Sequence, residues 1–219
     1  MRLEGLLLGL ATAGFLMSSV PVGDPTRAQS SSAPEQKVSQ VDQPTQPRGP
    51  EAKGPVPKFG VLWEGKLTRS GLPKNEDGWK WLREQGVNSI VNFRARNDVD
   101  YKRYGFDHSL WIPMDNGRLP TQAEAESYLA WIQEPANQPV NIQCAEGKDR
   151  TGMMAALARY AIDGWSIDRS LSEASLYRKG EPLANVRIRW LREWASKHPP
   201  GSHRRKSVGE SRPNDSTPE

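Results

Sequence analysis

The single cysteine of this chain, Cys144, heads a short run of residues that could carry out nucleophilic chemistry. Five residues separate it from an arginine, Arg150, and a hydroxyl residue, Thr151, follows directly. An apolar stretch, 139–142, precedes the run, and a helix-like stretch, 153–158, follows it. The pattern therefore predicts a strand, a tight loop and a helix in succession.

A loop in this position suits a phosphate group, because its backbone N–H groups point inward and the helix N-terminus lies beneath its centre. The same surroundings lower the pKa of a cysteine, so Cys144 would attack phosphorus as a thiolate and form a cysteinyl-phosphate. Arg150 would hold two phosphate oxygens with its planar fork, and Thr151 would hydrogen-bond the departing sulfur. This scheme needs no metal and no cofactor. We expect the remaining loop residues to bind the substrate: Ala145, Glu146, Gly147, Lys148, Asp149 and Gly152.

The run CAEGKDRTG, 144–152, resembles the Cys-x5-Arg-Thr/Ser signature of the protein tyrosine phosphatase superfamily and is most similar to its bacterial dual-specificity-like branch. The likeness continues in GKLTRSGLP, 65–73, and in GVNSIVNFR, 86–94, and it covers residues 60–180. The resemblance implies the Cys-based phosphatase fold and an enzyme of the protein tyrosine or dual-specificity phosphatase type, a phosphoric monoester hydrolase.

Two positions depart from the pattern of that superfamily. Gln143 stands where the family usually has a histidine, which removes one contributor to thiolate stability. The family places its acidic aspartate on a movable loop, often directly before a glycine; here Asn116 holds that place and Asp115 precedes it. We expect Asp115 to protonate the leaving oxygen, with Asp149 inside the loop as the alternative acid.

Alternating strands and helices predict an α/β domain with a central, largely parallel sheet flanked by helices. The phosphate loop is expected at the C-terminal end of a central strand, where open α/β sheets bind ligands. A capping box, 121–124, predicts a helix that runs to about residue 133. The histidines, His108, His198 and His203, show no metal-ligand spacing, so no metal site is predicted.

The N-terminus, 1–28, is predicted to be a signal peptide or a membrane anchor. Residues 5–20 are apolar and uncharged, Arg2 precedes them, and Thr26-Arg27-Ala28 offers a cleavage site between small residues. The apolar stretch is short for a membrane span, which favours a cleaved signal over an uncleaved anchor. The sequence therefore predicts an exported protein, periplasmic or extracellular, with anchoring at the membrane as the alternative.

The rest of the chain divides by composition. Residues 29–57 are rich in Gln, Ser and Pro and predict a disordered linker, 58–199 form the phosphatase domain, and 200–219 form a disordered polar tail. A net charge of +4 is modest, so no nucleic-acid partner is expected. We expect a monomer.

Three functions compete at this stage. The leading one is a phosphatase whose substrate is a phosphotyrosine or phosphoserine protein or an inositol phosphate. Gln143 and the displaced acid motivate a second, a catalytically weak module that holds a phosphorylated ligand. A rhodanese-like sulfurtransferase also uses a loop cysteine, but Thr151 and its neighbour Arg150 favour phosphate over sulfane sulfur.

Overall fold

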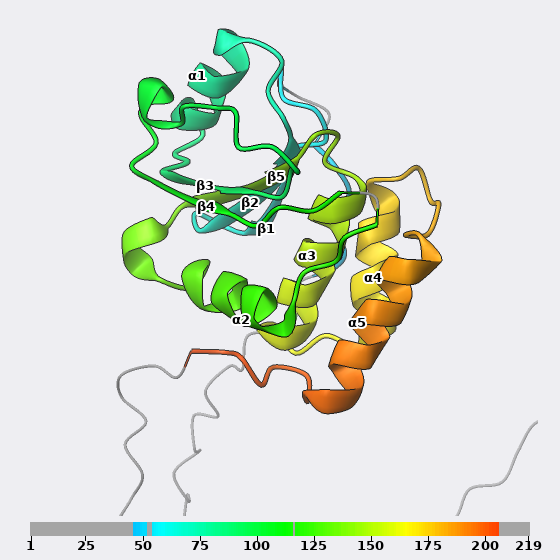
Figure 1. The fold of residues 1–219 in the computed structure, drawn as a ribbon. Helices are drawn as coiled ribbons and strands as arrows, with labels where there is room; N and C mark the ends of the chain where they lie inside the picture. The colour runs from blue at the N-terminus through cyan, green and yellow to red at the C-terminus, as the bar shows by residue number, and fades with distance from the viewer. Residues whose placement is uncertain (1–45, 52–53, 116, 206–219) are drawn as a thin grey trace, which may run out of the picture. The chain divides into compact units, whose positions relative to one another are not determined.

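The computed structural model describes residues 46–51, 54–115 and 117–205 (Figure 1). The predicted export segment, 1–28, lies outside the described residues, as do most of the predicted linker and of the predicted tail. Among the helices that the structure describes, none is both long enough and apolar enough to cross a membrane.

Five strands form one sheet in the order β1-β2-β5-β3-β4. β1 and β2 form an antiparallel pair, whereas β2, β5, β3 and β4 pair in parallel. The prediction of a largely parallel sheet is therefore confirmed. β4 was not anticipated, because three of its four residues are exposed and give no apolar pattern. The strand bounds are Gly60–Trp63 (β1), Leu67–Gly71 (β2), Ser89–Asn92 (β3), His108–Trp111 (β4) and Val140–Cys144 (β5).

Helices cover both faces of the sheet, as predicted. In Figure 1, α1 lies on one side of the strands and α2, α3, α4 and α5 lie on the other. Successive strand residues serve the two layers in turn, since Ile90 packs into the apolar cluster with α1 and Val91 packs into the cluster with α3. The helix bounds are Glu76–Glu84 (α1), Gln122–Trp131 (α2), Asp149–Ala161 (α3), Ile167–Leu176 (α4) and Asn185–Lys197 (α5), with short 3-10 turns at Lys102–Tyr104 and Pro135–Asn137.

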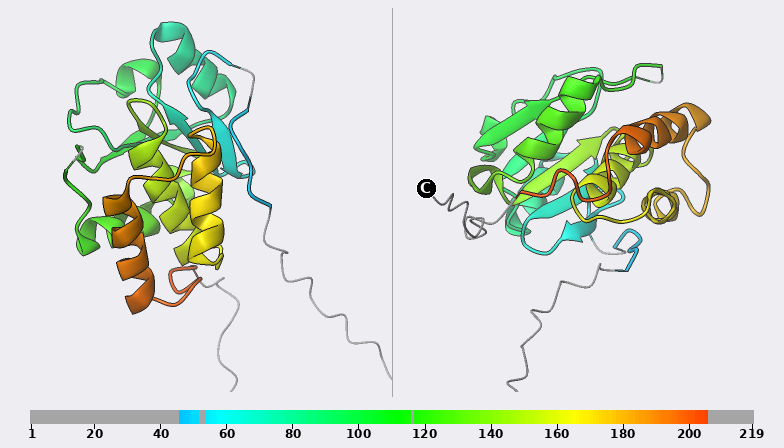
Figure 2. Two further views of the ribbon diagram at one scale, coloured as in Figure 1. Left: turned by 90° about the vertical axis from the view of Figure 1, so that its right-hand side faces the viewer. Right: turned by 90° about the horizontal axis from the view of Figure 1, so that it is seen from below.

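α3 is the central helix of the second layer. Every residue from Thr151 to Ala161 is buried, because α3 contacts β5, α4 and α5 (Figure 2). A helix that is apolar on all sides is stable only when it is surrounded in this way. The burial fixes the position of the α3 N-terminus, at which the phosphate loop ends.

A buried ion pair joins α3 to α4. The Arg159 guanidinium donates to both oxygens of Glu173, at 2.8 and 2.9 Å, and it also pairs with Asp163 at 2.8 Å. Both Arg159 and Glu173 are almost fully buried. Removal of one partner from such a pair typically costs about 3–5 kcal/mol, so this contact holds the helical layer together.

The domain begins before the predicted boundary at residue 58. Tyr177 donates its hydroxyl to the Gly49 carbonyl at 3.2 Å, and the Gly71 amide donates to the Pro57 carbonyl at 2.6 Å. Val56 is buried. The Gln-, Ser- and Pro-rich composition typical of linkers concealed these contacts, because they are made to the main-chain carbonyls of Gly49 and Pro57 and leave no side-chain signal.

The predicted tail also begins too early. The amides of Gly201 and His203 donate to the carbonyls of Tyr160 and Ala161, each at 2.9 Å. The Arg205 amide donates to the Gln133 side chain at 2.8 Å. Residues 200–205 are therefore bound to the domain by backbone hydrogen bonds. Amino-acid composition does not predict such bonds.

Candidate active site

The cysteine lies at the C-terminal end of β5, between β2 and β3 at the centre of the sheet. Cys144 is opposite Gly71 in the parallel register with β2, and α3 begins a few residues later at Asp149. The predicted order of strand, tight loop and helix is therefore confirmed. The loop stands at the edge of the sheet where open α/β folds bind ligands.

The Cys144 thiol is only 2% exposed, and the Gly147 amide donates to its sulfur at 3.3 Å. Burial alone would raise the pKa of this thiol. Hydrogen bonds from the hydroxyl and amide of Thr151, the charge of Arg150 and the amide of Glu146 outweigh burial and lower the pKa below its ordinary value. The surroundings therefore favour the thiolate, which is the nucleophilic form.

The Thr151 hydroxyl serves two acceptors. It is fully buried, lies 3.4 Å from the Ser70 carbonyl and also hydrogen-bonds Cys144. A hydroxyl has a single proton to donate, so donation to the sulfur competes with donation to the carbonyl. Thr151 is therefore positioned to donate to the sulfur when the sulfur is a thiolate.

Arg150 reaches from the phosphate loop to the segment that carries the predicted acid. Its Nη1 donates to the Met114 carbonyl at 3.1 Å, and Met114 directly precedes Asp115. The side chain is half-buried at the mouth of the loop. The arginine thus brings the predicted nucleophile loop and the predicted acid segment together.

The phosphate loop is held from outside by hydrogen bonds to its carbonyls. Arg69 donates from Nη2 to the Gly147 carbonyl at 2.9 Å, and the Leu72 amide donates to the Ala145 carbonyl at 3.2 Å. Gly147 has φ +71°, and a Cβ there would lie 2.5 Å from the Gly71 nitrogen. Only glycine fits this turn, because the backbone of β2 leaves no room for a side chain.

Arg69 supports the site, whereas the sequence favoured a structural ion pair for it over a substrate contact. It is fully buried on β2, and its guanidinium lies 3.5 Å from the centre of the Tyr177 ring. Its Nε and Nη1 have no hydrogen-bond partner among the described residues. Burial lowers its pKa, although the nearby Tyr177, Glu173 and Cys144 oppose that shift. The stacked ring and the Gly147 carbonyl hold this cation beneath the loop.

Gln143 points away from the thiol. Successive strand residues face opposite sides of the sheet, and the Gln143 amide donates to the Tyr101 hydroxyl at 3.3 Å in the layer with α1. Its buried Oε1 has no partner in the described part of the chain. The thiolate is therefore stabilised by the loop, Thr151 and Arg150, without help from this position.

The carboxylate of Asp115 caps its own segment. It is exposed and accepts hydrogen bonds from the Arg118 amide at 2.6 Å and the Gly117 amide at 2.8 Å. These two bonds lower the pKa of Asp115, and the charges of Arg118 and Arg150 add to the effect. In this arrangement the carboxyl group favours its ionised form.

The other charged side chains of the loop, including the alternative acid Asp149, form ion pairs. Asp149 forms an ion pair with Arg178, whose Nε donates to the Pro182 carbonyl at 2.9 Å. Lys148 and Glu146 pair with each other at 2.8 Å. The structure thus directs Asp149 toward the connection between α4 and α5, rather than toward Arg150.

Arg187 is a second cation that the sequence did not reveal. It lies on α5, is 3% exposed, and its Nη2 donates to the Asp115 carbonyl at 3.3 Å. Burial lowers its pKa, and the charges of Asp149, Arg150 and Cys144 act on it as well. Arg187 therefore lies within electrostatic range of the thiol, although it is distant from the loop in sequence.

A buried, activated thiol on a strand–loop–helix turn, with an arginine at the mouth of the loop, defines a cysteine-dependent phosphatase of the tyrosine and dual-specificity class. Residues 62–189, more than half of the chain, match the family described as DSP-PTPase phosphatase fused to NAD+ kinase. The chain belongs to this family. The predicted class is therefore confirmed.

Known relatives agree with this assignment. The dual specificity protein phosphatase TpbA of Pseudomonas aeruginosa is 28% identical over 137 residues, which are 56% of this chain and 62% of that protein. The chain thus matches less than two thirds of the relative's length. The crystal structure of P. aeruginosa TpbA in complex with pTyr has a TM-score of 0.51 at 24% identity and covers 68% of this chain and 97% of that one.

A yeast enzyme shares the fold as well. The core catalytic domain of the PP-IP phosphatase SIW14 from S. cerevisiae, in complex with citrate, has a TM-score of 0.52 at 21% identity. The match covers 65% of this chain and 93% of that domain. At these identities, both structures show the Cys-based phosphatase fold.

Proposed function

We propose that this chain hydrolyses phosphate monoesters through a cysteinyl-phosphate intermediate. The observation that carries the proposal is the Cys144 thiol, whose pKa is lowered despite its burial by Thr151, Arg150 and the loop amides. A lowered pKa enlarges the fraction of thiolate, which is the nucleophilic form, and the thiol stands where a phosphate would bind.

In the first step, the thiolate of Cys144 attacks phosphorus and an S–P bond forms while the bond from phosphorus to the leaving oxygen breaks. The loop N–H groups and the fork of Arg150 stabilise the equatorial oxygens. Asp115 gives its proton to the leaving oxygen, which departs as an alcohol or a phenol.

In the second step, water attacks the phosphorus of the intermediate and the S–P bond breaks. Asp115, now a carboxylate, takes the proton from water, and Thr151 donates its hydroxyl hydrogen bond to the departing thiolate. Inorganic phosphate is released, and Cys144 is ready for another cycle.

The Asp115 carboxylate must break its hydrogen bonds to the Gly117 and Arg118 amides before it can act as the acid. Its bonds to the amides of Gly117 and Arg118 favour the ionised form, so the protonated form requires these bonds to open. A bound phosphate would draw the Arg150 guanidinium away from the Met114 carbonyl. The segment that carries Asp115 would then be free to move. Asp149 is the second choice, because its side chain is engaged by Arg178, which lies toward the connection between α4 and α5.

The charges around the loop favour a phosphorylated protein side chain as the substrate. Most cations at the rim are neutralised by a carboxylate, in the pairs Lys148–Glu146, Arg178–Asp149 and Arg118–Glu124. The contacts of Arg150 and Arg187 are instead to carbonyls and a sulfur. This balance suits one phosphate group on a tyrosine or serine. An inositol phosphate with several phosphates would also approach the carboxylates of Glu146 and Asp149, which repel it.

The Cys144→Ser variant tests the mechanism. We expect it to lose turnover of an aryl phosphate while it still binds vanadate or phosphate, because a serine hydroxyl does not ionise near neutral pH and the loop and Arg150 remain. Substantial turnover by this variant would refute the cysteinyl-phosphate. If the unaltered protein binds phosphate but does not turn over the aryl phosphate, the weak binding module is the better description.

The substrate is tested separately on the unaltered protein. Rates are compared for a phosphotyrosine peptide, a phosphoserine peptide, inositol phosphates and phosphoinositides at equal concentration. The charge balance at the rim predicts the highest kcat/KM for one of the peptides. A clear preference for inositol polyphosphates would overturn the choice of substrate and leave the mechanism standing.

A further inference from the structure

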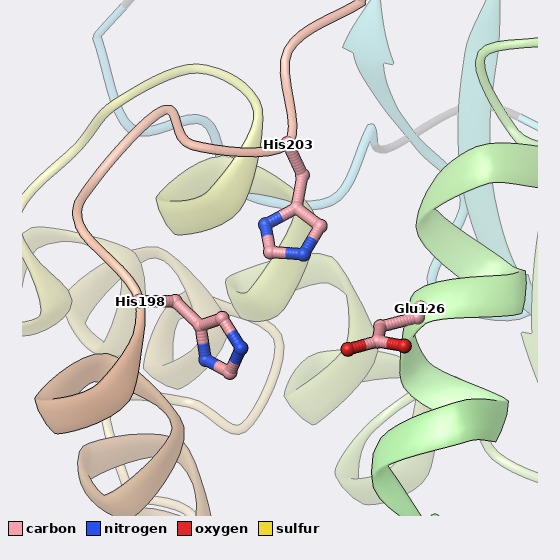
Figure 3. A group of neighbouring side chains, drawn as sticks. All are labelled: Glu126, His198 and His203. Carbon is pink, nitrogen blue, oxygen red and sulfur yellow. The ribbon is translucent and has the colours of Figure 1, made fainter.

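A second group of chemically active side chains lies at the end of α5 opposite to Arg187. Glu126 of α2, His198 at the end of α5 and His203 in the following turn point toward one another (Figure 3). One nitrogen of each ring and one carboxylate oxygen lie within 4.8 Å of one another. Sequence spacing predicted no metal site here, because the third member comes from a helix that is remote in the chain.

The backbone holds the two histidines in place. The His203 amide donates to the Ala161 carbonyl at 2.9 Å, and the Tyr160 hydroxyl donates to the His198 carbonyl at 2.7 Å. Both attachments are to the end of α3, which is buried at the centre of the helical layer. The two rings are therefore brought together by rigid parts of the fold and not by a chance approach of surface side chains.

Hydrogen bonds leave one nitrogen of each ring available. The Nδ1 of His198 lies 3.0 Å from the Trp194 carbonyl, and a carbonyl only accepts, so Nδ1 carries the proton and Nε2 keeps its lone pair. The Nδ1 of His203 lies 3.0 Å from the Ser202 hydroxyl, which leaves its Nε2 for another partner. Metal-binding histidines commonly have their second nitrogen bonded in this way.

The third ligand is oriented too. Gln122, one turn earlier on α2, donates from its amide to Oε1 of Glu126 at 2.9 Å. The other carboxylate oxygen remains for a ligand. Packing against Trp194 accounts in part for both rings, since its ring centre lies 4.1 Å from that of His198 and 5.5 Å from that of His203. It does not explain why the Glu126 carboxylate converges on the same two rings.

We propose that Glu126, His198 and His203 bind a divalent transition-metal ion, with zinc as the best match. Two neutral imidazoles and one carboxylate are a ligand set that zinc accepts, and water would complete four-coordination. Bonds of roughly 2.0–2.1 Å place tetrahedral ligand atoms about 3.3 Å apart, so the three side chains would close slightly around the ion. Small side-chain rotations of the exposed Glu126 and the half-buried rings can supply this movement while the backbone keeps its place.

The bound ion would have a structural role as a cross-link. It would tie α2 to the end of α5 and to the turn 199–203 through three ligands from separate segments. A ligand that binds only the folded state raises its stability in proportion to occupancy. The proposal is independent of the phosphatase reaction, since the loop residues take no part in it.

The test is a titration of the full chain, without any added histidine tag, with Co²⁺ and Zn²⁺. We expect one ion per chain by calorimetry, the visible absorption of tetrahedral Co²⁺, and a rise in Tm of about 5 °C or more at a hundredfold excess over Kd. The same titration is made on Cys144→Ser, because a reactive thiolate also binds these metals. Binding should persist in that variant, and its loss would place the metal on the thiol and overturn the proposal.

Ligand variants provide the second arm. Glu126→Gln changes an exposed side chain on α2 and leaves the fold intact, and His203→Ala removes one ring; each should weaken binding about tenfold or more. His108→Ala is the matched control, because His108 is exposed on β4 and outside the cluster. Unchanged affinity in both ligand variants, an equal loss in His108→Ala, or no binding at millimolar metal would refute the site.

Discussion

Arg150 has a planar fork of N–H donors that a lysine lacks. Its guanidinium reaches the Met114 carbonyl at the mouth of the loop and in our proposal turns to hold two phosphate oxygens. Arg150→Lys keeps the charge but loses the planar fork, so we expect kcat for an aryl phosphate to fall on the order of 10²-fold or more. Steady-state kinetics measure this change. Near-normal turnover would show that Arg150 does not stabilise the transition state.

The dependence of the rate on the leaving group can identify the catalytic acid. Asp115→Asn should slow phosphoserine-type substrates, whose leaving oxygen is strongly basic, far more than activated aryl phosphates, which leave without a proton. Rates for a series of leaving groups measure the dependence, with Asp149→Asn as the control. Equal slowing of both substrate types by Asp115→Asn would make that residue structural, and a leaving-group dependence in Asp149→Asn alone would move the acid into the loop.

At the residue scale, sequence spacing located Cys144, Arg150 and Thr151, because one short loop carries all three. It could not locate Arg69 or Arg187, since these come from a strand and a helix that the fold brings to the loop from far along the chain. Nor could spacing show that the Asp115 carboxylate caps its own turn, because two backbone amides form that contact.

At the element scale, the loop depends on the close approach of β2. Gly147→Ala combines a positive φ with a Cβ 2.5 Å from the Gly71 nitrogen, so we expect lower stability and a large loss of turnover. Gly65→Ala is the matched control, because Gly65 also has a positive φ, +63°, but no atom lies within 4 Å of its Cβ position. The control should lose only about 1–2 kcal/mol of unfolding free energy and keep its activity.

Denaturant unfolding and aryl phosphate turnover measure both variants. If Gly147→Ala matched Gly65→Ala in both measurements, the packing of the loop against β2 would not govern the geometry of the site. The comparison separates the strain of a positive φ, which both positions share, from the lack of room that belongs to position 147 alone.

Elements with strong local signals were predictable. The capping box of Thr121 and Glu124 opens α2 as expected, because its hydrogen bonds are made within four residues. The start of α5 at Asn185 was less predictable, because Pro182 and Leu183 belong to the connection before it, in which Leu183 lies against Gly152 of α3. Such long-range packing has no periodic signature in the sequence.

At the scale of the whole molecule, export remains a prediction. The apolar stretch 5–20 and the small residues of Thr26-Arg27-Ala28 motivate it, and both lie outside the described residues. We expect the mature protein to lack about its first 28 residues. Mass spectrometry of protein recovered from its native host measures the N-terminus, and an intact Met1 on cytoplasmic protein would contradict export.

The segment around Gly49 has a practical consequence for anyone who shortens this chain. The Gly49 carbonyl accepts from the Tyr177 hydroxyl, the Tyr177 ring lies against Arg69, and Arg69 holds the Gly147 carbonyl. A truncation at Lys58, where composition places the edge of the domain, would remove Gly49. The buried Tyr177 hydroxyl would then lose its acceptor. The phosphate loop is therefore supported by a segment whose composition is typical of a linker, and a shortened chain should keep Gly49 and the residues that follow it.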